Sequence, residues 1–492
     1  MVQKPGRPLI LSDYRPLPGV PDELLAPDGS IRPVWAGLIA HLDAMKSDER
    51  ERAFARGAQY LRDAGVFVRN YGEDKSLRDW PLSPVPVIQP ASEWQALGEG
   101  LAERADLLEE IVADLYGENR LVAEGHLPAS IVASNPEWLR PLVGVKPASG
   151  HFLHFLSFEI GRGPDGGWWV LGDRTQAPSG AGYALENRVA SARSYSGFFS
   201  GANVERLAGF FRAFRDGLNA LRREDGSRAG ILTPGPMNET YFEHAYIARY
   251  LGMMLLEGDD LTVDDGRLMV RTVSGLKPIS VLWRRLDAVW ADPLELESSS
   301  HLGTPGLLGA VRSQGVTMIN ALGAGILESR AFLAFMPRLS EVLHGKPLAV
   351  PNIATWWCGG EAERAHVRAN AEAMLIGPAN STLLPLEAEP GVVLRGDMSE
   401  IGLDLDAWLA AEGRNLVGQE LVSLSTTPSW EDGGLKPRPM RIRVFMARTR
   451  DGWQLMSGGF ARLAASGQDS SAVSISRGGT VADVWVVSDK PV

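Results

Sequence analysis

The chain has 492 residues, and 49 Lys and Arg against 60 Asp and Glu give it a formal net charge of −11. Its length corresponds to about three domains or subdomains, and its hydrophobic content of 45% and charged content of 22% are those of an ordinary globular protein. This composition excludes collagen, coiled coil and long disorder as the main architecture. The negative charge disfavours a general nucleic-acid binder, because phosphate neutralisation needs a basic face.

A single cysteine, Cys358, excludes an intramolecular disulfide and disfavours a zinc knuckle, which needs several ligands. A reducing compartment is expected from this cysteine usage. The first residues lack the apolar core of a signal peptide, and the longest apolar runs fall far short of the ~20 residues that span a membrane. We therefore expect a soluble, cytoplasmic protein with no membrane contact.

The first predicted unit, residues 1–80, is a lobe of helices and loops. Residues 34–42 and 51–61 carry apolar side chains at helical spacing. A second unit, residues 81–229, opens with a short strand and continues with a long helical segment over 94–116.

A β-hairpin is predicted over residues 151–175. A run of aromatic and branched residues leads into the turn signal Pro164-Asp-Gly-Gly, and the chain returns in an apolar strand. The arms and exit carry two acids and two arginines, namely Glu159, Arg162, Asp173 and Arg174. Acids that face each other across paired strands suit a hard cation such as Mg²⁺, and arginines suit phosphate or carboxylate. The alternative is a surface ion-pair cluster.

Small residues and glycine dominate the loop that follows, residues 173–182, and they let the backbone approach a ligand. The helical segment after it supplies a carboxylate, an amide and a guanidinium in Glu186, Asn187 and Arg188. A ligand-binding loop and an ordinary helix-entry loop both fit this pattern. An amphipathic helix is predicted over 204–222.

Residues 230–350 form the third predicted unit, in which strands alternate with helices. We expect strands at 230–233, 253–256, 281–284 and 316–320, a hairpin over 261–270 and a helix over 238–251. This alternation favours a mostly parallel sheet. His244 lies in mid-helix and is expected to be packed rather than catalytic.

The last unit, residues 351–492, returns to an α+β pattern, with strands at 441–446, 453–456 and 484–487. Gln419 and Glu420 end a predicted strand and could meet an adenine amino group. Arg443 and Arg462 lie on neighbouring predicted strands and could meet phosphates. The alternative is a twisted sheet with Gly-rich turns.

Six segments together resemble one known family: 173–188, 232–252, 284–309, 320–328, 355–359 and 418–425, with strings such as LTPGPMNETYFEHAYIARYLG and NALGAGILE. They resemble the circularly permuted type 2 ATP-grasp family, which is related to the synthetase domain of glutathionylspermidine synthetase. The resemblance implies an α+β and α/β architecture. In it, the two lobes of a circularly permuted ATP-grasp fold hold the nucleotide in a cleft, and a pre-ATP-grasp-like α/β domain is added.

The resemblance also implies ATP-dependent ligation of a carboxylate to an amine or thiol, with ATP and Mg²⁺ as cofactors. The implied substrate is a small molecule or peptide that carries the carboxylate and the amine, and a protein of the same pathway is a further candidate partner. By position, the implied metal ligands are Glu159, Asp173, Glu186 and Asn187. The implied catalytic arginines, facing phosphate or acylphosphate, are Arg162, Arg174 and Arg188. The implied nucleotide-binding residues are Gln419, Glu420, Arg443 and Arg462.

The chain departs from the family pattern at three places. Active relatives often carry Glu-Asp-Asn after the second hairpin strand, where this chain has Gly172-Asp173-Arg174. Asp is usual at the position of Glu159. A basic residue is often found in the stretch that here reads Ile376-Gly-Pro378.

Two functions therefore stay open. One is a Mg²⁺-dependent ligase that joins an amino group to a carboxylate on a peptide-like small molecule. The other is a catalytically degenerate ATP-grasp protein that serves as a nucleotide-binding or scaffold partner. The ligase interpretation expects residues 160–174 and 419–462 to form opposite walls of one nucleotide cleft. A hydrolase is disfavoured, because no nucleophile–base pair is visible.

Overall fold

The computed structural model describes residues 8–69, 77–223, 226–383, 394–395, 404–465 and 479–489. Its helices are α1 (Pro33–Ala44), α2 (Ser47–Ala64), α3 (Ala91–Tyr116), α4 (Arg120–Ala123), α5 (Ala129–Ala133), α6 (Ala181–Ser194), α7 (Ser196–Phe199), α8 (Ala208–Ala220), α9 (Tyr241–Leu251), α10 (Leu307–Arg312), α11 (Arg330–His344), α12 (Glu361–Ala369) and α13 (Leu405–Glu412). Its strands are β1 (Phe67–Arg69), β2 (Leu77–Asp79), β3 (Val87–Pro90), β4 (Phe155–Arg162), β5 (Trp168–Arg174), β6 (Arg228–Leu232), β7 (Met254–Leu256), β8 (Leu261–Asp264), β9 (Arg267–Thr272), β10 (Gly275–Arg284), β11 (Thr317–Ile319), β12 (Thr355–Trp357), β13 (Met374–Pro378), β14 (Leu394–Arg395), β15 (Leu416–Glu420), β16 (Thr426–Glu431), β17 (Gly434–Thr449), β18 (Gly452–Leu463) and β19 (Thr480–Val487). Across these described ranges, every helix is too short or too polar to cross a membrane.

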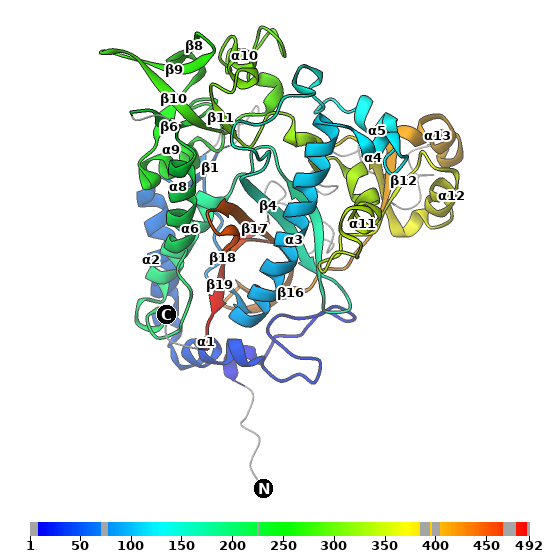
Figure 1. Ribbon diagram of the computed structural model, residues 1–492. Helices are drawn as coiled ribbons and strands as arrows, with labels where there is room; N and C mark the ends of the chain where they lie inside the picture. The colour runs from blue at the N-terminus through cyan, green and yellow to red at the C-terminus, as the bar shows by residue number, and fades with distance from the viewer. Residues whose placement is uncertain are drawn as a thin grey trace.

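A seven-stranded sheet lies at the centre of the molecule (Figure 1). Its order is β3-β19-β18-β17-β4-β5, and β16 also pairs with β17. The predicted hairpin over 151–175 is confirmed as β4 and β5, which pair antiparallel. β17 pairs antiparallel with both β4 and β18. Strands from the predicted units 81–229 and 351–492 thus share one sheet.

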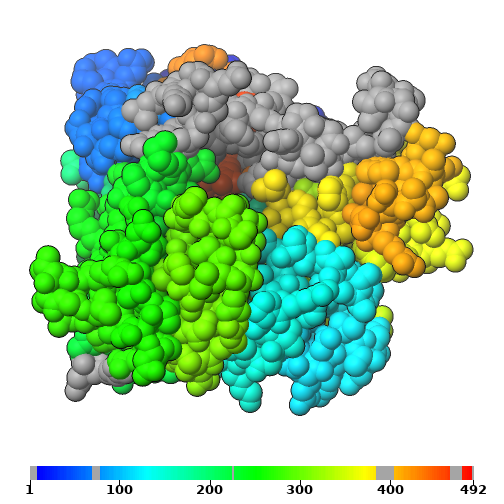
Figure 2. Space-filling model, turned by 90° about the horizontal axis from the view of Figure 1, so that it is seen from above, coloured from blue at the N-terminus to red at the C-terminus, as the bar shows by residue number. Residues whose placement is uncertain are grey.

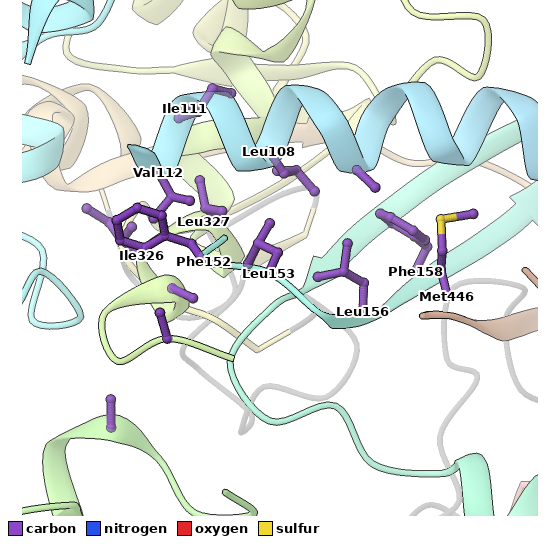
Figure 3. Packing of buried hydrophobic residues seen from close by; sticks show 14 of the residues in the cluster. Leu108, Ile111, Val112, Phe152, Leu153, Leu156, Phe158, Ile326, Leu327 and Met446 are labelled. Atoms are coloured by element: carbon purple, nitrogen blue, oxygen red, sulfur yellow. The ribbon is translucent and has the colours of Figure 1, made fainter. Parts of the chain in front are cut away.

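Helices cover both faces of this sheet because its strands are apolar on both sides. α3 lies over one face, where Leu108 of the helix lies above Leu156 of β4, and Val112 lies beside Phe152 just before β4 (Figure 3). The alternate residues of the same strands point to the other face, where they form a second core with α6 and α8. In this core Phe155 packs against aromatic rings of α8 and β17. Each fully buried side chain of this kind contributes about 1.5–3 kcal/mol.

The second sheet has the order β7-β6-β10-β9-β8, and β11 pairs with β10. β7, β6, β10 and β11 run parallel, so the predicted parallel core is confirmed. The predicted hairpin is confirmed as β8 and β9, and the first half of β10 pairs with β9 in an antiparallel extension. Asp265 and Gly266 at the hairpin turn both have positive φ, as a type I′ turn requires.

The predicted helix over 238–251 starts later than expected, at the first residue of α9. Asn238 does not cap this helix, because its side chain accepts from the backbone of Thr240 at 2.9 Å within the preceding turn. His244 is buried, and its two ring nitrogens bond the hydroxyls of Thr233 and Thr240 at 2.9 and 3.0 Å. Its predicted packing role is confirmed.

A four-stranded antiparallel sheet, in the order β12-β15-β13-β14, forms a separate lobe with α12 and α13. Its small core contains Cys358, Val367 and Met374. Residues 421–425 lead from β15 into the seven-stranded sheet, where the Ser425 backbone N–H donates to the Arg162 carbonyl at 3.0 Å. The two sheets are therefore joined directly along the chain.

Candidate functional site

One buried carboxylate among three arginines marks the candidate site on the seven-stranded sheet. Glu159 of β4 pairs in register with Arg443 of β17, and Arg441 of β17 pairs with Arg462 of β18. Because side chains alternate along a strand, all four lie on the same face of the sheet. We name these four residues the arginine cluster.

Arg443 makes the shortest contact in the arginine cluster. Its Nε donates to Glu159 Oε1 at 2.5 Å. Arg441 Nε lies 3.7 Å from Glu159 Oε2, and Arg462 Nη1 lies 3.9 Å from Oε1. The Glu159 side chain is fully buried, whereas the Arg462 side chain is 15% exposed. The cluster therefore extends from the sheet interior toward solvent on the side of Arg462.

The small-residue loop that enters α6 lies against the arginine cluster. Arg443 Nη1 donates to the Ser179 carbonyl at 2.9 Å. Gly180 has a φ of 115°, and a Cβ there would lie 3.0 Å from the Phe445 ring, so glycine allows this close approach. The Gly180 N–H donates to Glu243 Oε1 at 2.8 Å, which fixes the loop to α9.

A hollow is visible above the central sheet when the molecule is seen from the top of Figure 1. Figure 2 shows atoms of the C-terminal strands, coloured red-brown, at the bottom of this hollow. They lie between the residues coloured green and those coloured yellow. Strands of the seven-stranded sheet therefore form part of the floor between the second sheet and the four-stranded lobe.

Mg²⁺ does not fit at Glu159. Gly172 is the register partner of Glu159, and Arg174, two residues on, shares that face. Neither Gly172 nor Arg174 supplies a side-chain oxygen that could complete a metal site with Glu159. Three guanidinium groups within 3.9 Å of the Glu159 carboxylate would also repel a divalent cation. Within the described ranges, no three Asp, Glu, His or Cys side chains are grouped to hold a metal ion.

Asp173 points away from Glu159, which corrects the expectation that the two acids face each other. Its register partner is Phe158, on the α3 side of the sheet. There Arg104 of α3 donates through Nε and Nη2 to the two Asp173 oxygens, each at 2.7 Å. Both side chains are buried, so this bidentate pair ties α3 to β5.

Arg174 connects the hairpin to the four-stranded lobe. Its Nη1 lies 3.4 Å from Glu328 Oε2 and donates to the carbonyl of Thr382, which follows β13. Glu328 Oε1 accepts from the backbone N–H of Thr175 at 2.7 Å. Arg174 is thus placed beside the arginine cluster, on the face of Glu159, but it bonds a different acid.

Two further arginines predicted to be catalytic have structural partners. Arg162 lies at the other end of β4 and bonds Glu23 at 2.9 Å and Glu93 at 2.6 Å. Arg188 Nε donates to the buried Asp483 at 2.8 Å and fixes α6 to β19. The structure does not bring either arginine into the arginine cluster.

Glu186 and Asn187 face aromatic side chains instead of joining Glu159. Trp80 Nε1 donates to Asn187 Oδ1 at 2.9 Å. Burial and a hydrogen bond to Glu186 raise the pKa of Tyr60 to about 12. Their predicted metal role has no support from this geometry.

Gln419 and Glu420 end β15 in the four-stranded sheet. Gln419 Nε2 donates to Thr355 Oγ1 at 3.1 Å, while its Oε1 is buried and lacks a hydrogen bond within the described part of the chain. Arg443 and Arg462 instead share the sheet of Glu159, so 441–462 and 159–174 form one wall. The expectation that all of 419–462 stands opposite the hairpin is corrected in this respect.

No site role was predicted for three residues of this region: Arg441, Arg104 and Glu328. Arg441 stands two residues before Arg443 in a predicted strand, so side-chain alternation was a signal for it. Arg104 and Glu328 lie 69 and 154 residues from the hairpin residues that they bond. No local spacing reveals contacts across such distances.

Comparison with known proteins gives the family and the fold. The circularly permuted ATP-grasp type 2 family matches residues 86–464. The uncharacterized protein Rv2567 of Mycobacterium tuberculosis is 33% identical over 97% of this chain and 54% of its own length, so this chain spans about half of that relative. Uncharacterized protein sll0335 of Synechocystis is 30% identical over 95% of this chain and 96% of its own length.

A solved structure supports the same fold. The apo structure of a glutathione synthetase-like effector from Globodera pallida superposes with a TM-score of 0.56. It covers 90% of this chain and 98% of the effector at 9% sequence identity, so the similarity concerns the fold alone. The chain belongs to the circularly permuted type 2 ATP-grasp family.

Proposed function

We propose that this chain is an ATP-dependent carboxylate–amine ligase that acts through an acylphosphate on a peptide-like small molecule. The arginine cluster carries the proposal. Three guanidinium groups converge on the single carboxylate of Glu159. A cluster of arginines on one face of a sheet suits a phosphate-bearing ligand, because guanidinium groups bond phosphate oxygens strongly.

The proposed reaction has two steps. A substrate carboxylate oxygen attacks the γ-phosphorus of ATP, the bond to the β–γ bridging oxygen breaks, and ADP leaves. The amine then attacks the carbonyl carbon of the acylphosphate, the carbon–oxygen bond to phosphate breaks, and the amine proton passes to solvent. In both steps Arg441, Arg443 and Arg462 would stabilise negative charge on phosphoryl oxygens.

The end of β15 supports the adenine part of this proposal. Gln419 Oε1 is a buried acceptor with no hydrogen bond from any described residue, and the adenine amino group is a donor. Glu420 is the last residue of the same strand, directly before the linker to the seven-stranded sheet. ATP and Mg²⁺ are the usual cofactors of the family. The binding of Mg²⁺ stays a prediction with no assigned site, because the groups around Glu159 do not fit a divalent cation.

A second candidate function is favoured by one specific observation. Gly172 and Arg174, not Asp173, share the face of Glu159, so this face lacks the second carboxylate that a Mg²⁺ site would use. A chain that lacks this carboxylate could bind a nucleotide in the arginine cluster without turning it over. It would then serve as a nucleotide-binding or scaffold partner.

Calorimetric titration of the full chain with ATP and with its non-hydrolysable analogue AMP-PNP tests the nucleotide site. We expect saturable binding by the wild type and at least about tenfold weaker binding by Arg443→Gln. Arg448→Gln is the matched control, because Arg448 lies on the same strand but bonds the Leu153 carbonyl outside the cluster. Equal binding by both variants would remove the arginine cluster from the proposal.

Phosphate release then separates the two functions. A ligase releases phosphate from ATP only when a carboxylate and an amine are both supplied, for example as a panel of amino acids and dipeptides. A degenerate protein binds ATP and releases none. No binding of either nucleotide would contradict both functions.

A further inference from the structure

We infer that a second cavity, remote from the arginine cluster, binds a zwitterionic ligand of dipeptide size with an apolar side chain. The cavity has a volume of about 510 Å³, within the roughly 300–1,000 Å³ of small-molecule sites. It lies beside α1, at the lower edge of Figure 1, and β3, α7 and the ends of β4 and β19 complete its walls. Its lining contains no member of the arginine cluster.

One wall of the cavity is apolar and rigid. Leu38 of α1, Phe198 of α7 and Trp485 of β19 line it. The rings of Phe198 and Trp485 stack with centroids 6.4 Å apart. Trp485 is fully buried, and its Nε1 donates to Asp483 at 2.7 Å, so it supports the half-buried Phe198 ring, which offers the apolar surface. An apolar ligand side chain buried here gains hydrophobic free energy.

The floor is a hydrogen-bonded network centred on Arg162. Its guanidinium bonds Glu23 and Glu93 and stacks over Trp168 at 4.2 Å. Gln89 Nε2 donates to Glu23 Oε2 at 3.0 Å. These groups satisfy one another, so the floor is preorganised and the charge of Arg162 is already balanced. Arg162 therefore positions Glu93 rather than binding an anion itself.

Charges of both signs line the cavity beyond this network. Arg32 donates through Nε to the Asp22 carbonyl at 3.0 Å, and its two Nη atoms have no acceptor among the described residues. Asp489 is exposed, and within the same described ranges it has no ion-pair or hydrogen-bond partner. Arg32 can thus take a carboxylate, while Asp489 can take an ammonium group.

A peptide with free termini combines these requirements. It carries one carboxylate, one ammonium group and side chains that can be apolar, and a dipeptide fills a cavity of this size better than one amino acid. The inference does not depend on the proposed ligase activity, because binding here needs no nucleotide.

Calorimetric titration without nucleotide tests the ligand class. The probes are L-leucyl-L-phenylalanine, its N-acetyl derivative, which lacks the ammonium group, and its C-terminal amide, which lacks the carboxylate. We expect saturable binding of the free dipeptide and at least about tenfold weaker binding of each derivative. Equal affinity for all three, or no binding of the free dipeptide at millimolar concentration, would overturn the inference.

Two variants locate the binding. A Cβ at Gly37 would make ordinary contact with Phe198 at 3.6 Å, so Gly37→Leu should fold and fill the cavity from α1. Gly209→Leu on α8 is the matched control, because no atom lies within 4 Å of its Cβ position. We expect Gly37→Leu to lose dipeptide binding and Gly209→Leu to keep it.

Arg32→Gln provides a second test of where the dipeptide binds, in case Gly37→Leu fails to fold. This variant should bind the free dipeptide only as weakly as wild type binds the amide, with the affinity for the amide unchanged. Wild-type affinity of Gly37→Leu or Arg32→Gln for the free dipeptide would place the binding elsewhere and overturn the inference.

Discussion

Two adjacent residues of β5 have opposite environments. Gly172 faces Glu159 and the arginine cluster, whereas Asp173 is buried on the α3 side with Arg104. A carboxylate at 173 therefore neutralises a helix arginine. Gly172 leaves the face of Glu159 without a second carboxylate from β5. The charge of a residue in a short motif says little about its function until the face of the sheet on which it lies is known.

Asp173→Asn should lower stability rather than act only on turnover. The substitution leaves the buried Arg104 guanidinium without its counter-charge, which typically costs about 3–5 kcal/mol. Urea unfolding of variant and wild type measures this loss. Asp165→Asn in the exposed turn of the same hairpin is the control and should be nearly neutral.

A double substitution of Arg104 and Asp173 distinguishes the effect of the buried charges on stability from the effect of side-chain packing. Replacing the pair by Arg104→Met and Asp173→Leu should recover most of the lost stability, because it removes the unpaired charge. A single Asp173→Asn variant as stable as wild type would show that the pair is not needed for the α3 contact.

His154 predicts a pH dependence of stability. Burial, with a smaller effect of nearby Arg448, lowers the pKa of its imidazole from 6.5 to about 3. Between these values the unfolded chain binds a proton that the native chain does not, so stability falls as pH falls below about 6.5. His154→Gln should therefore lose about 1.4 kcal/mol less stability than wild type between about pH 7.5 and about pH 5.5. Urea unfolding at the two pH values measures this, and equal losses would contradict a neutral buried imidazole.

At the scale of elements, the hairpin β4–β5 shows what the sequence could predict. Its turn signal and flanking aromatic residues were enough to place both strands. Its register was not predictable, because it depends on turn geometry and on an irregularity after Glu159 that lets β5 carry one extra residue. A shift of one residue reverses every side chain, and this is why Asp173 was expected on the wrong face.

The arginine cluster was only partly predictable for a related reason. Arg443 and Arg462 were found from the strand pattern, and the strand–helix alternation of 230–350 gave the parallel core. The pairing of β17 with β4, however, joins residues 284 positions apart. The hydrophobic periodicity of a sequence does not indicate which distant strands pair. The arginines were therefore expected on a separate wall from Glu159.

Adding a carboxylate and an amide to this face of the hairpin should create a metal-binding site. The double variant Gly172→Glu and Arg174→Asn adds a carboxylate and an amide on the face of Glu159 and removes one cation. We expect it to bind Mn²⁺ in the presence of AMP-PNP at least about tenfold more tightly than wild type. Calorimetry measures this, with Gly172→Gln and Arg174→Asn as the control of equal size. Equal metal affinity of variant and control would exclude this face as a metal site.

At the scale of the whole molecule, two sheets contribute to the proposed nucleotide site. The seven-stranded sheet carries the arginine cluster, and the four-stranded sheet carries Gln419 and Glu420. Residues 421–425 join them covalently, and Arg174 joins them through its bond to Thr382. A ligand that bridges both sheets would add a third connection and would stabilise their relative position.

Hydrogen exchange should show this connection as simultaneous protection of both sheets. A nucleotide at 100 times its dissociation constant stabilises the native state by about 2.7 kcal/mol and slows exchange that needs opening of the bound site. We expect AMP-PNP to slow exchange in peptides from β15 and from β17 together. The β8–β9 hairpin, which projects from the second sheet at the top of Figure 1, should be unaffected and serves as the internal control. Protection confined to β17 would mean that the arginine cluster binds phosphate alone, and that Gln419 and Glu420 do not bind the base.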